Sequence, residues 1–167
     1  PMCGSGTLAI EAATIAVRKA PQIHRRKGEF HFEWLADFDR ALWRETQDRI
    51  RAEKLDAPPC IVAASDIRAE YVDMARKSAL KARVEKYIWF EVARVQDVVP
   101  PAPIGLLATN LPYGDRIGDK PQLAALHRAL GQRLSQEFKG WRVGLITNDA
   151  TLAAATPTRG MQIALEL

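Results

Sequence analysis

The sequence predicts an α/β fold, a Rossmann-like and mostly parallel sheet with helices on both of its faces. Three observations support this prediction. Short apolar runs alternate along the chain with longer segments of helical periodicity, which is typical of βαβ units. A glycine-rich turn, Gly4-Ser5-Gly6, leads directly into the first helical segment. Polar residues follow several apolar runs, and folds of this class bind ligands at the carboxyl ends of parallel strands.

The helical segments are indicated by their periodicity and by their end signals. Residues 7–20 are rich in Ala and Leu, and Pro21 ends them. The second segment has Asp37 or Asp39 as its cap, and the fourth has Pro at its first turn. Helices are therefore expected at residues 7–20, 37–55, 68–82, 121–138 and 150–155, with an irregular segment at 22–35.

The strand segments are short and rich in apolar, β-branched or aromatic residues. Strands are expected at residues 60–64, 87–93, 104–108, 141–147 and 161–167. Asp66, Asp97 and Asn110 come shortly after the first three of these runs. Because the carboxyl ends of parallel strands meet at one edge of a sheet, we expect the three polar side chains to lie together.

The composition indicates one globular domain spanning residues 1–167, with 47% apolar and 26% charged residues. The sequence has no apolar stretch of membrane-spanning length and no signal segment. Cys3 and Cys60 form neither a disulfide framework nor a metal-ligand spacing, so we expect no metal and a cytoplasmic location. The net charge of +4 is compatible with a nucleic-acid partner without requiring one.

The chain opens on Pro1, just before a turn that a preceding strand would normally aim at a ligand. We therefore expect a fragment, truncated at its N-terminus, in which the first strand is absent. The alternative is a short start without fixed structure, whose glycines merely form a turn.

The glycine turn and Asp66 are candidates for holding a nucleotide-like cofactor. Gly4 and Gly6 allow the backbone to turn sharply and approach a ligand, and the helix that follows presents free N–H groups. Asp66, at the end of a strand, can accept hydrogen bonds from both hydroxyls of a ribose, and Asp97 from an adenine amino group. The long gap from Gly6 to Asp66 argues against a nicotinamide dehydrogenase, where the offset is about 20 residues.

Residues 110–113, Asn-Leu-Pro-Tyr, are candidates for holding a planar amine. The amine of a base is a poor nucleophile, and two acceptors on its hydrogens would aim its nitrogen. The Asn110 side-chain oxygen and the Leu111 carbonyl are these acceptors, since Pro112 keeps Leu111 extended. Tyr113 offers a ring for the extruded base. Together with the cofactor turn, this pattern predicts methyl transfer from S-adenosylmethionine to the exocyclic nitrogen of a nucleobase.

Simpler interpretations exist for the same residues. Asp66 can cap the helix at 68–82, Asp97 can be a loop carboxylate, and Asn-X-Pro-Tyr is a common turn composition. The position of Asn110 after a buried strand, with a glycine turn upstream, favours a functional site.

Residues 1–7, 65–67 and 110–116 resemble motifs of the THUMP-associated RNA methyltransferases, in particular the bacterial 23S rRNA guanine-N2 methyltransferases. The resemblance continues through Phe32-Glu33-Trp34, Ala41-Leu42-Trp43 and Gly144-Leu145-Ile146-Thr147-Asn148-Asp149. Three departures are that the Asp preceding Pro1 in the family is absent, that Leu111 replaces a Pro, and that the THUMP-type RNA-binding region that precedes the domain is missing.

The resemblance implies a Rossmann-like methyltransferase fold, S-adenosylmethionine as donor, guanine N2 in 23S rRNA as acceptor, and an upstream THUMP-type RNA-binding region. The residues implied in cofactor binding are Cys3, Gly4, Ser5, Gly6, Thr7, Asp66, Ile67 and Asp97. Those implied in catalysis are Asn110, Leu111, Pro112 and Tyr113.

Several features outside these motifs have two interpretations. The dense basic cluster at residues 24–27 can contact RNA phosphates or be a solvated loop. Arg116 can meet a phosphate of the target nucleotide. The tryptophans Trp34, Trp43, Trp89 and Trp141 are expected in the core and not as stacking platforms, but the stacking role stays open for Trp34, which lies in an irregular segment. Cys3 is expected to be structural.

Two other functions fit the same residues. An adenine N6 methyltransferase acting on DNA or RNA would use the same Asn-X-Pro-Tyr pattern. A non-catalytic nucleotide-binding or RNA-binding module would need only the cofactor turn or the basic cluster.

Overall fold

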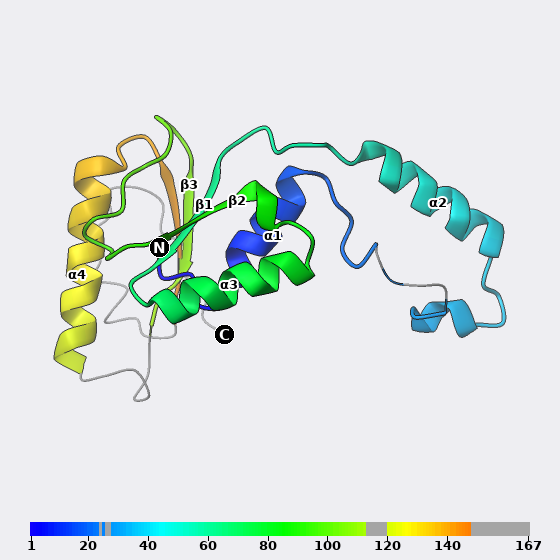
Figure 1. The fold of residues 1–167 in the computed structure, drawn as a ribbon, viewed down its shortest axis with the longest axis horizontal. Helices are drawn as coiled ribbons and strands as arrows, with labels where there is room; N and C mark the ends of the chain where they lie inside the picture. Colours follow the sequence, from blue (N-terminus) through cyan, green and yellow to red (C-terminus); the bar gives the residue numbers. More distant parts are fainter. Residues whose placement is uncertain (24, 26–27, 113–119, 148–167) are drawn as a thin grey trace.

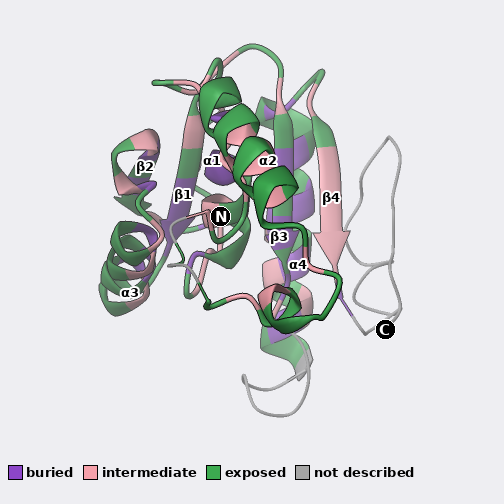
Figure 2. Cartoon of the chain, turned by 90° about the vertical axis from the view of Figure 1, so that its right-hand side faces the viewer, coloured by how far each residue is buried: buried purple, intermediate pink, exposed green. Residues whose placement is uncertain are grey.

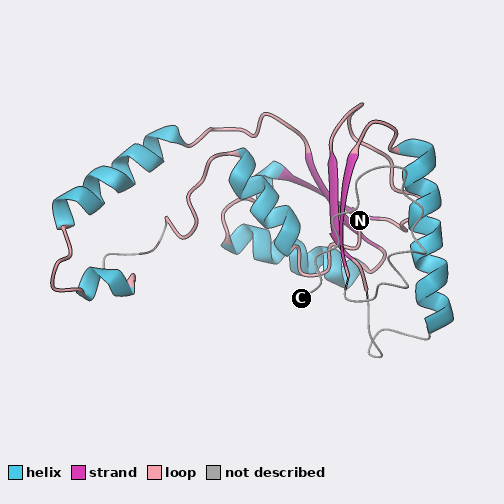
Figure 3. Cartoon of the chain, turned by 180° about the vertical axis from the view of Figure 1, so that it is seen from behind, coloured by secondary structure: helices cyan, strands magenta, loops and turns pink. Residues whose placement is uncertain are grey.

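The computed structural model describes residues 1–167 except 24, 26–27, 113–119 and 148–167. Parallel strands form the middle layer, with α4 on one side and α1 and α3 on the other (Figures 1 and 3). The elements are α1 (Thr7–Ala16), η1 (His31–Trp34), α2 (Arg40–Glu53), β1 (Val62–Asp66), α3 (Ala69–Lys81), η2 (Glu85–Tyr87), β2 (Ile88–Val92), β3 (Leu106–Asn110), α4 (Lys120–Glu137) and β4 (Arg142–Ile146). The predicted α/β class is confirmed.

The helices predicted at 37–55, 68–82 and 121–138 correspond to α2, α3 and α4, although α2 begins three residues later and ends two residues earlier than predicted. Helix α1 ends at Ala16, four residues earlier than predicted, because the chain turns at Arg18, whose φ of 52° is left-handed. Helix α2 is capped by the Asp39 side chain, which accepts hydrogen bonds from two backbone N–H groups. The predicted helix at 150–155 and strand at 161–167 lie outside the described residues.

Strand β1 lies two residues later than predicted and includes the polar pair Ser65 and Asp66. These residues pair with Glu91 and Val92 of β2, so backbone hydrogen bonding extends the strand beyond its apolar part. Strand β3 likewise includes Asn110 as its last residue. Two of the predicted site residues are therefore held within strands and not in the loops after them.

The strands form two parallel pairs, β1 with β2 and β3 with β4. The first three residues of the chain join the two pairs. The Cys3 N–H donates to the Ser65 carbonyl at 2.9 Å, and the Thr109 hydroxyl donates to the Pro1 carbonyl at 2.8 Å. The start of the chain thus lies between the carboxyl ends of β1 and β3.

Each strand pair packs against its own apolar cluster. The first lies under α1 and α3, and the second lies under α4. The buried members of the first are Ala13, Ala64, Val72, Ala75, Ala79, Val84, Ile88 and Phe90. The buried members of the second are Val95, Leu107, Leu111, Leu130, Leu134 and Phe138. These two clusters fix β1 and β3, whose ends carry the predicted site.

Residues 18–54 form an arm that extends from the strands and carries η1 and α2 (Figures 1 and 3). The two ends of the arm meet, because the Leu55 N–H donates to the Val17 carbonyl at 2.9 Å. The segment expected to be irregular contains the short 3₁₀ helix η1 within this arm.

The prediction that all four tryptophans are core residues was wrong for two of them. Trp34 is 79% exposed and Trp89 is 65% exposed, while Trp43 and Trp141 are half-buried. Helix α2, which carries Trp43, has no buried residue (Figure 2). Trp89 lies between the buried Ile88 and Phe90, so strand alternation turns it to the opposite face of the sheet.

None of the helices in the described part of the chain combines the length and apolar character needed to cross a membrane.

Gly6 is required where α1 meets α3, and its replacement tests this contact. Its φ is +85°, and a Cβ there would lie 2.8 Å from the Ala75 Cβ. We expect Gly6→Ala to lower the free energy of unfolding by about 2–4 kcal/mol, since backbone strain and overpacking add.

Gly140 is the matched control, because its φ is +83° but its added Cβ would meet nothing within 4 Å. Gly140→Ala should cost only about 1 kcal/mol. Urea denaturation of both variants measures the difference, and equal costs would contradict the proposed contact.

Candidate active site

The glycine turn has a left-handed backbone at Met2, Gly4 and Gly6, with φ values of 55°, 51° and 85°. The Gly6 N–H donates to the Cys3 carbonyl at 2.8 Å and closes the turn. Helix α1 then begins at Thr7, and its N-cap, Gly6, supplies no side-chain cap. The first N–H groups of α1 are therefore available to an acceptor outside the helix.

Asp66 holds this turn from the end of β1. Its Oδ2 accepts from the Gly4 N–H at 3.0 Å, and its Oδ1 accepts from the Arg68 N–H at 3.1 Å. The side chain is buried, with 6% of its surface exposed. The N-cap of α3 is Arg68 and not Asp66. Asp66 nevertheless orients Arg68 through the hydrogen bond from its N–H.

The space around the turn suits the approach of a ligand. A Cβ added at Gly4 would meet no atom within 4 Å, so the backbone there faces open space beside the buried Asp66 carboxylate. Ser5 and Thr7 are exposed on the same turn, and their hydroxyls lie 3.2 Å apart. Oxygens and N–H groups thus surround a position that a polar cofactor can reach.

Thr109 connects the glycine turn to the second motif. It is 1% exposed, and its hydroxyl donates to the Pro1 carbonyl. Because Asn110 is the next residue, this hydrogen bond places the end of β3 beside the start of the glycine turn.

Residues 110–112 present polar groups on a fixed backbone. Asn110 is exposed at the end of β3, paired in register with Ile146. The Leu111 N–H donates to the Ile146 carbonyl at 2.9 Å, and the Leu111 side chain is 1% exposed within the second apolar cluster. The Leu that replaces the family Pro therefore anchors this segment by packing.

The described contacts connect the remaining predicted residues less directly to the glycine turn. Ile67 is exposed directly after β1, and Asp97 is exposed in the turn after β2. The described contacts do not join Asp97 to the glycine turn, so its role stays a prediction. Tyr113 and Arg116 lie outside the described residues.

Cys3 lies within the turn as a half-buried thiol. Burial, and then the negative charge of Asp66, raise the pKa of this thiol above its ordinary value. A raised pKa keeps the thiol protonated and unreactive near neutral pH, which agrees with the predicted structural role.

Sequence reasoning missed Thr109 and Met2. Thr109 reads as an ordinary β-branched strand residue, and Met2 packs its side chain against the cluster that contains Leu111. Both connect the two motifs in space. The only sequence signal was their position next to the motifs.

Metal ligation is not indicated at the site. In the part of the chain that the structure describes, no group of three or more His, Cys, Asp or Glu side chains could hold a metal ion.

A shallow pocket that includes Cys60, Lys86 and Trp89 lies at the amino ends of β1 and β2, at the opposite end of these strands from Asp66.

A family model described as the RMKL-like methyltransferase domain matches residues 1–165. The chain belongs to this family. The methyltransferase domain is 39% identical over 158 residues to the ribosomal RNA large subunit methyltransferase K/L of Shewanella oneidensis. It is 37% identical over the same length to that of Shewanella baltica. Each match covers 93% of this chain and 22% of the relative, so the chain spans about a fifth of the length of these relatives.

Solved structures give the same fold. The crystal structure of SMU.472, assigned as a methyltransferase and complexed with SAH, superposes with a TM-score of 0.83 at 29% identity. A predicted N6-adenine-specific DNA methylase from Listeria monocytogenes superposes with a TM-score of 0.79 at 26% identity. Both matches cover 93% of this chain and 40% of the other.

Replacing Thr109 tests the connection between the two motifs. We expect Thr109→Val to lower the free energy of unfolding by about 1–2 kcal/mol, because the Pro1 carbonyl loses its donor in a buried position. Thr109→Ser keeps the hydroxyl and should lose clearly less. Thermal or urea unfolding measures both, and a valine variant as stable as the parent would contradict this role.

The reactivity of the two cysteines tests the state of the Cys3 thiol. Cys60 is exposed, while burial and Asp66 raise the pKa of Cys3. We expect Cys60 to react faster than Cys3 with Ellman's reagent at pH 8, and the Cys3 rate to keep rising above that pH. The variants Cys60→Ser and Cys3→Ser isolate each thiol, and a faster Cys3 would contradict the assignment.

Proposed function

We propose that this methyltransferase domain uses S-adenosylmethionine to methylate the exocyclic N2 of a guanine in 23S rRNA. The observation that carries the proposal is the joining of two motifs at one edge of the sheet. The Asp66–Gly4 hydrogen bond orders the cofactor turn, and the Thr109–Pro1 hydrogen bond places Asn110 next to it. The names of the Shewanella relatives support the choice of ribosomal RNA.

The glycine turn would hold the cofactor through backbone groups and the buried carboxylate. The residues proposed to contact it are Cys3, Gly4, Ser5, Gly6, Thr7, Asp66, Ile67 and Asp97. S-adenosylmethionine, when bound, supplies an electrophilic methyl group. The SAH complex of a structural neighbour supports a site of this kind.

Asn110 and Leu111 would orient the amine. The Asn110 side-chain oxygen and the Leu111 carbonyl would accept hydrogen bonds from its two N–H groups, which would direct the nitrogen lone pair toward the methyl group. The bound cofactor would supply its methyl group to this nitrogen and leave as S-adenosylhomocysteine, and the displaced N–H proton would pass to solvent. Orientation of this kind lowers the barrier without a covalent intermediate.

The larger protein is also part of the proposal. Residues 1–167 would be one catalytic domain of a cytoplasmic protein with a strand before Pro1 and an upstream THUMP-type RNA-binding region. Pro112 and Tyr113 would complete the base pocket, with Tyr113 as the stacking ring.

Asn110→Ala tests the acceptor role. We expect methyl transfer to protein-free 23S rRNA to fall at least about 100-fold, because one oriented acceptor is lost. Calorimetric titration should give an S-adenosylhomocysteine affinity within about twofold of the parent, since Asn110 would contact the base and not the cofactor. Unchanged methyl transfer would exclude the acceptor role.

Asp66→Ala is the complementary variant in the same experiment. It removes the carboxylate that accepts from Gly4 and Arg68, so we expect S-adenosylhomocysteine binding to weaken at least about tenfold. An unchanged dissociation constant would exclude Asp66 from the cofactor site.

Adenine N6 methylation is the second candidate function, because the same two acceptors serve either amine. The structural neighbour named as an N6-adenine-specific DNA methylase supports keeping it. Methylation of duplex DNA in preference to ribosomal RNA would favour this function over the first.

A further inference from the structure

The side chain of Trp34 is fixed in place while most of its surface is open to solvent. At 79% exposed, it is the most exposed large apolar side chain in the described part of the chain. Its indole Nε1 donates to the Gly28 carbonyl at 3.1 Å, and the Gly28 N–H donates to the Glu33 carboxylate at 2.8 Å. Hydrogen bonds within the arm therefore orient a ring that packing does not cover.

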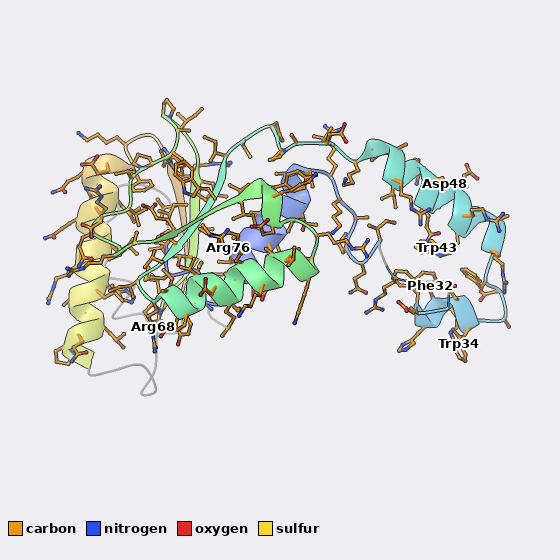
Figure 4. All side chains as sticks on the ribbon, viewed as in Figure 1. Phe32, Trp34, Trp43, Asp48, Arg68 and Arg76 are labelled. Carbon is orange, nitrogen blue, oxygen red and sulfur yellow. The ribbon has the colours of Figure 1, made fainter. Side chains whose placement is uncertain are left out.

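The arm supports this ring with an aromatic cluster of its own. The Phe32 and Trp43 rings meet edge to face with centroids 4.9 Å apart, and Phe30 stacks on Phe32 at 5.2 Å. Phe32 and Trp43 turn toward each other between η1 and α2, while Trp34 lies on the side of η1 that faces away from α2 (Figure 4). Because η1 is held against α2, the exposed ring is presented on a rigid base.

A positive charge lies near the segment to which this ring is hydrogen-bonded. Gly28 directly follows the basic cluster of residues 24–27 in the sequence. Arg25, the member of the cluster that the structure describes, is exposed. Its guanidinium lies 5.4 Å from the Phe30 ring centroid and donates to the Glu29 carbonyl at 3.2 Å. The nearby Glu33 carboxylate accepts a hydrogen bond from the Gly28 N–H, so one of its oxygens is directed toward the backbone of the arm.

We propose that the arm is an RNA-docking element in which Trp34 stacks on an unpaired base and Arg25 contacts a neighbouring phosphate. A fixed aromatic ring near an exposed guanidinium is a surface that single-stranded RNA favours. The 3₁₀ helix η1 lies at the outer end of the arm, away from the strands along the long axis of the molecule (Figures 1 and 3). The arm would therefore contact RNA outside the nucleotide that is methylated.

This inference rests on the proposed RNA substrate and assigns the arm a role in affinity. Because the arm lies away from Asn110, its contacts are the same before and during methyl transfer. Such contacts lower KM and leave kcat unchanged.

Trp34→Ala in the full-length protein tests the proposal. We expect KM for a protein-free 23S rRNA transcript to rise about tenfold, because stacking of one base is lost, with kcat unchanged. Arg25→Ala should reduce the slope of log affinity against log salt by about 0.7, as expected for one phosphate contact to a single strand. Filter binding across a salt series measures the affinities.

Trp89→Ala is the matched control, because it removes another exposed indole from a strand outside the arm. It should leave KM unchanged. The S-adenosylhomocysteine affinity of every variant reports whether the domain is still folded.

The outcomes separate the arm from the chemistry. Trp34-dependent RNA binding without methyl transfer to guanine would keep the docking role and overturn the proposed function. Methyl transfer with an unchanged KM in Trp34→Ala would overturn the docking role. So would a lower melting temperature or a changed oligomeric state with unchanged RNA affinity, since the ring would then pack on protein.

Discussion

The buried carboxylate of Asp66 is the interaction on which the rest of the site depends. A buried carboxylate is costly unless its oxygens are hydrogen-bonded, and here each oxygen has a backbone donor, from Gly4 and from Arg68. The backbone carbonyl of Asp66 also accepts from Ala93 at 2.9 Å. One residue therefore fixes the glycine turn, the start of α3 and the end of β2. The conformation of the turn is a property of this network and not of its glycines alone.

The elements with strong end signals could be predicted from the sequence. Helices α3 and α4 were predicted within one residue at each end, because periodicity and Pro121 mark them. Strand β1 was predicted two residues too early. Ser65 and Asp66 are polar, and the apolar run that indicates a strand stops before them. Their partners lie on β2, and strand pairing is not visible in the sequence of one strand.

The site could be predicted in its parts but not in its connections. The two motifs stand out as residue patterns, whereas Thr109 joins them through a hydroxyl that meets the backbone of Pro1 far along the chain. The two exposed tryptophans show a further limit. Residue type favours burial on average, but Trp34 lies beside a local aromatic cluster that is complete without it, and Trp89 lies on the opposite face of an alternating strand.

The hydrogen bond between Leu55 and Val17 holds the two ends of the arm together. Because the entropic cost of closing a loop grows only slowly with its length, related domains can lengthen, shorten or replace the arm at small cost to the sheet. With the arm as the proposed RNA-docking element, substrate choice and methyl-transfer chemistry would become separately evolvable. The same closure helps to bring Gly4 and Asp66 together in one site, although α1, η1, α2 and most of β1 separate them along the chain.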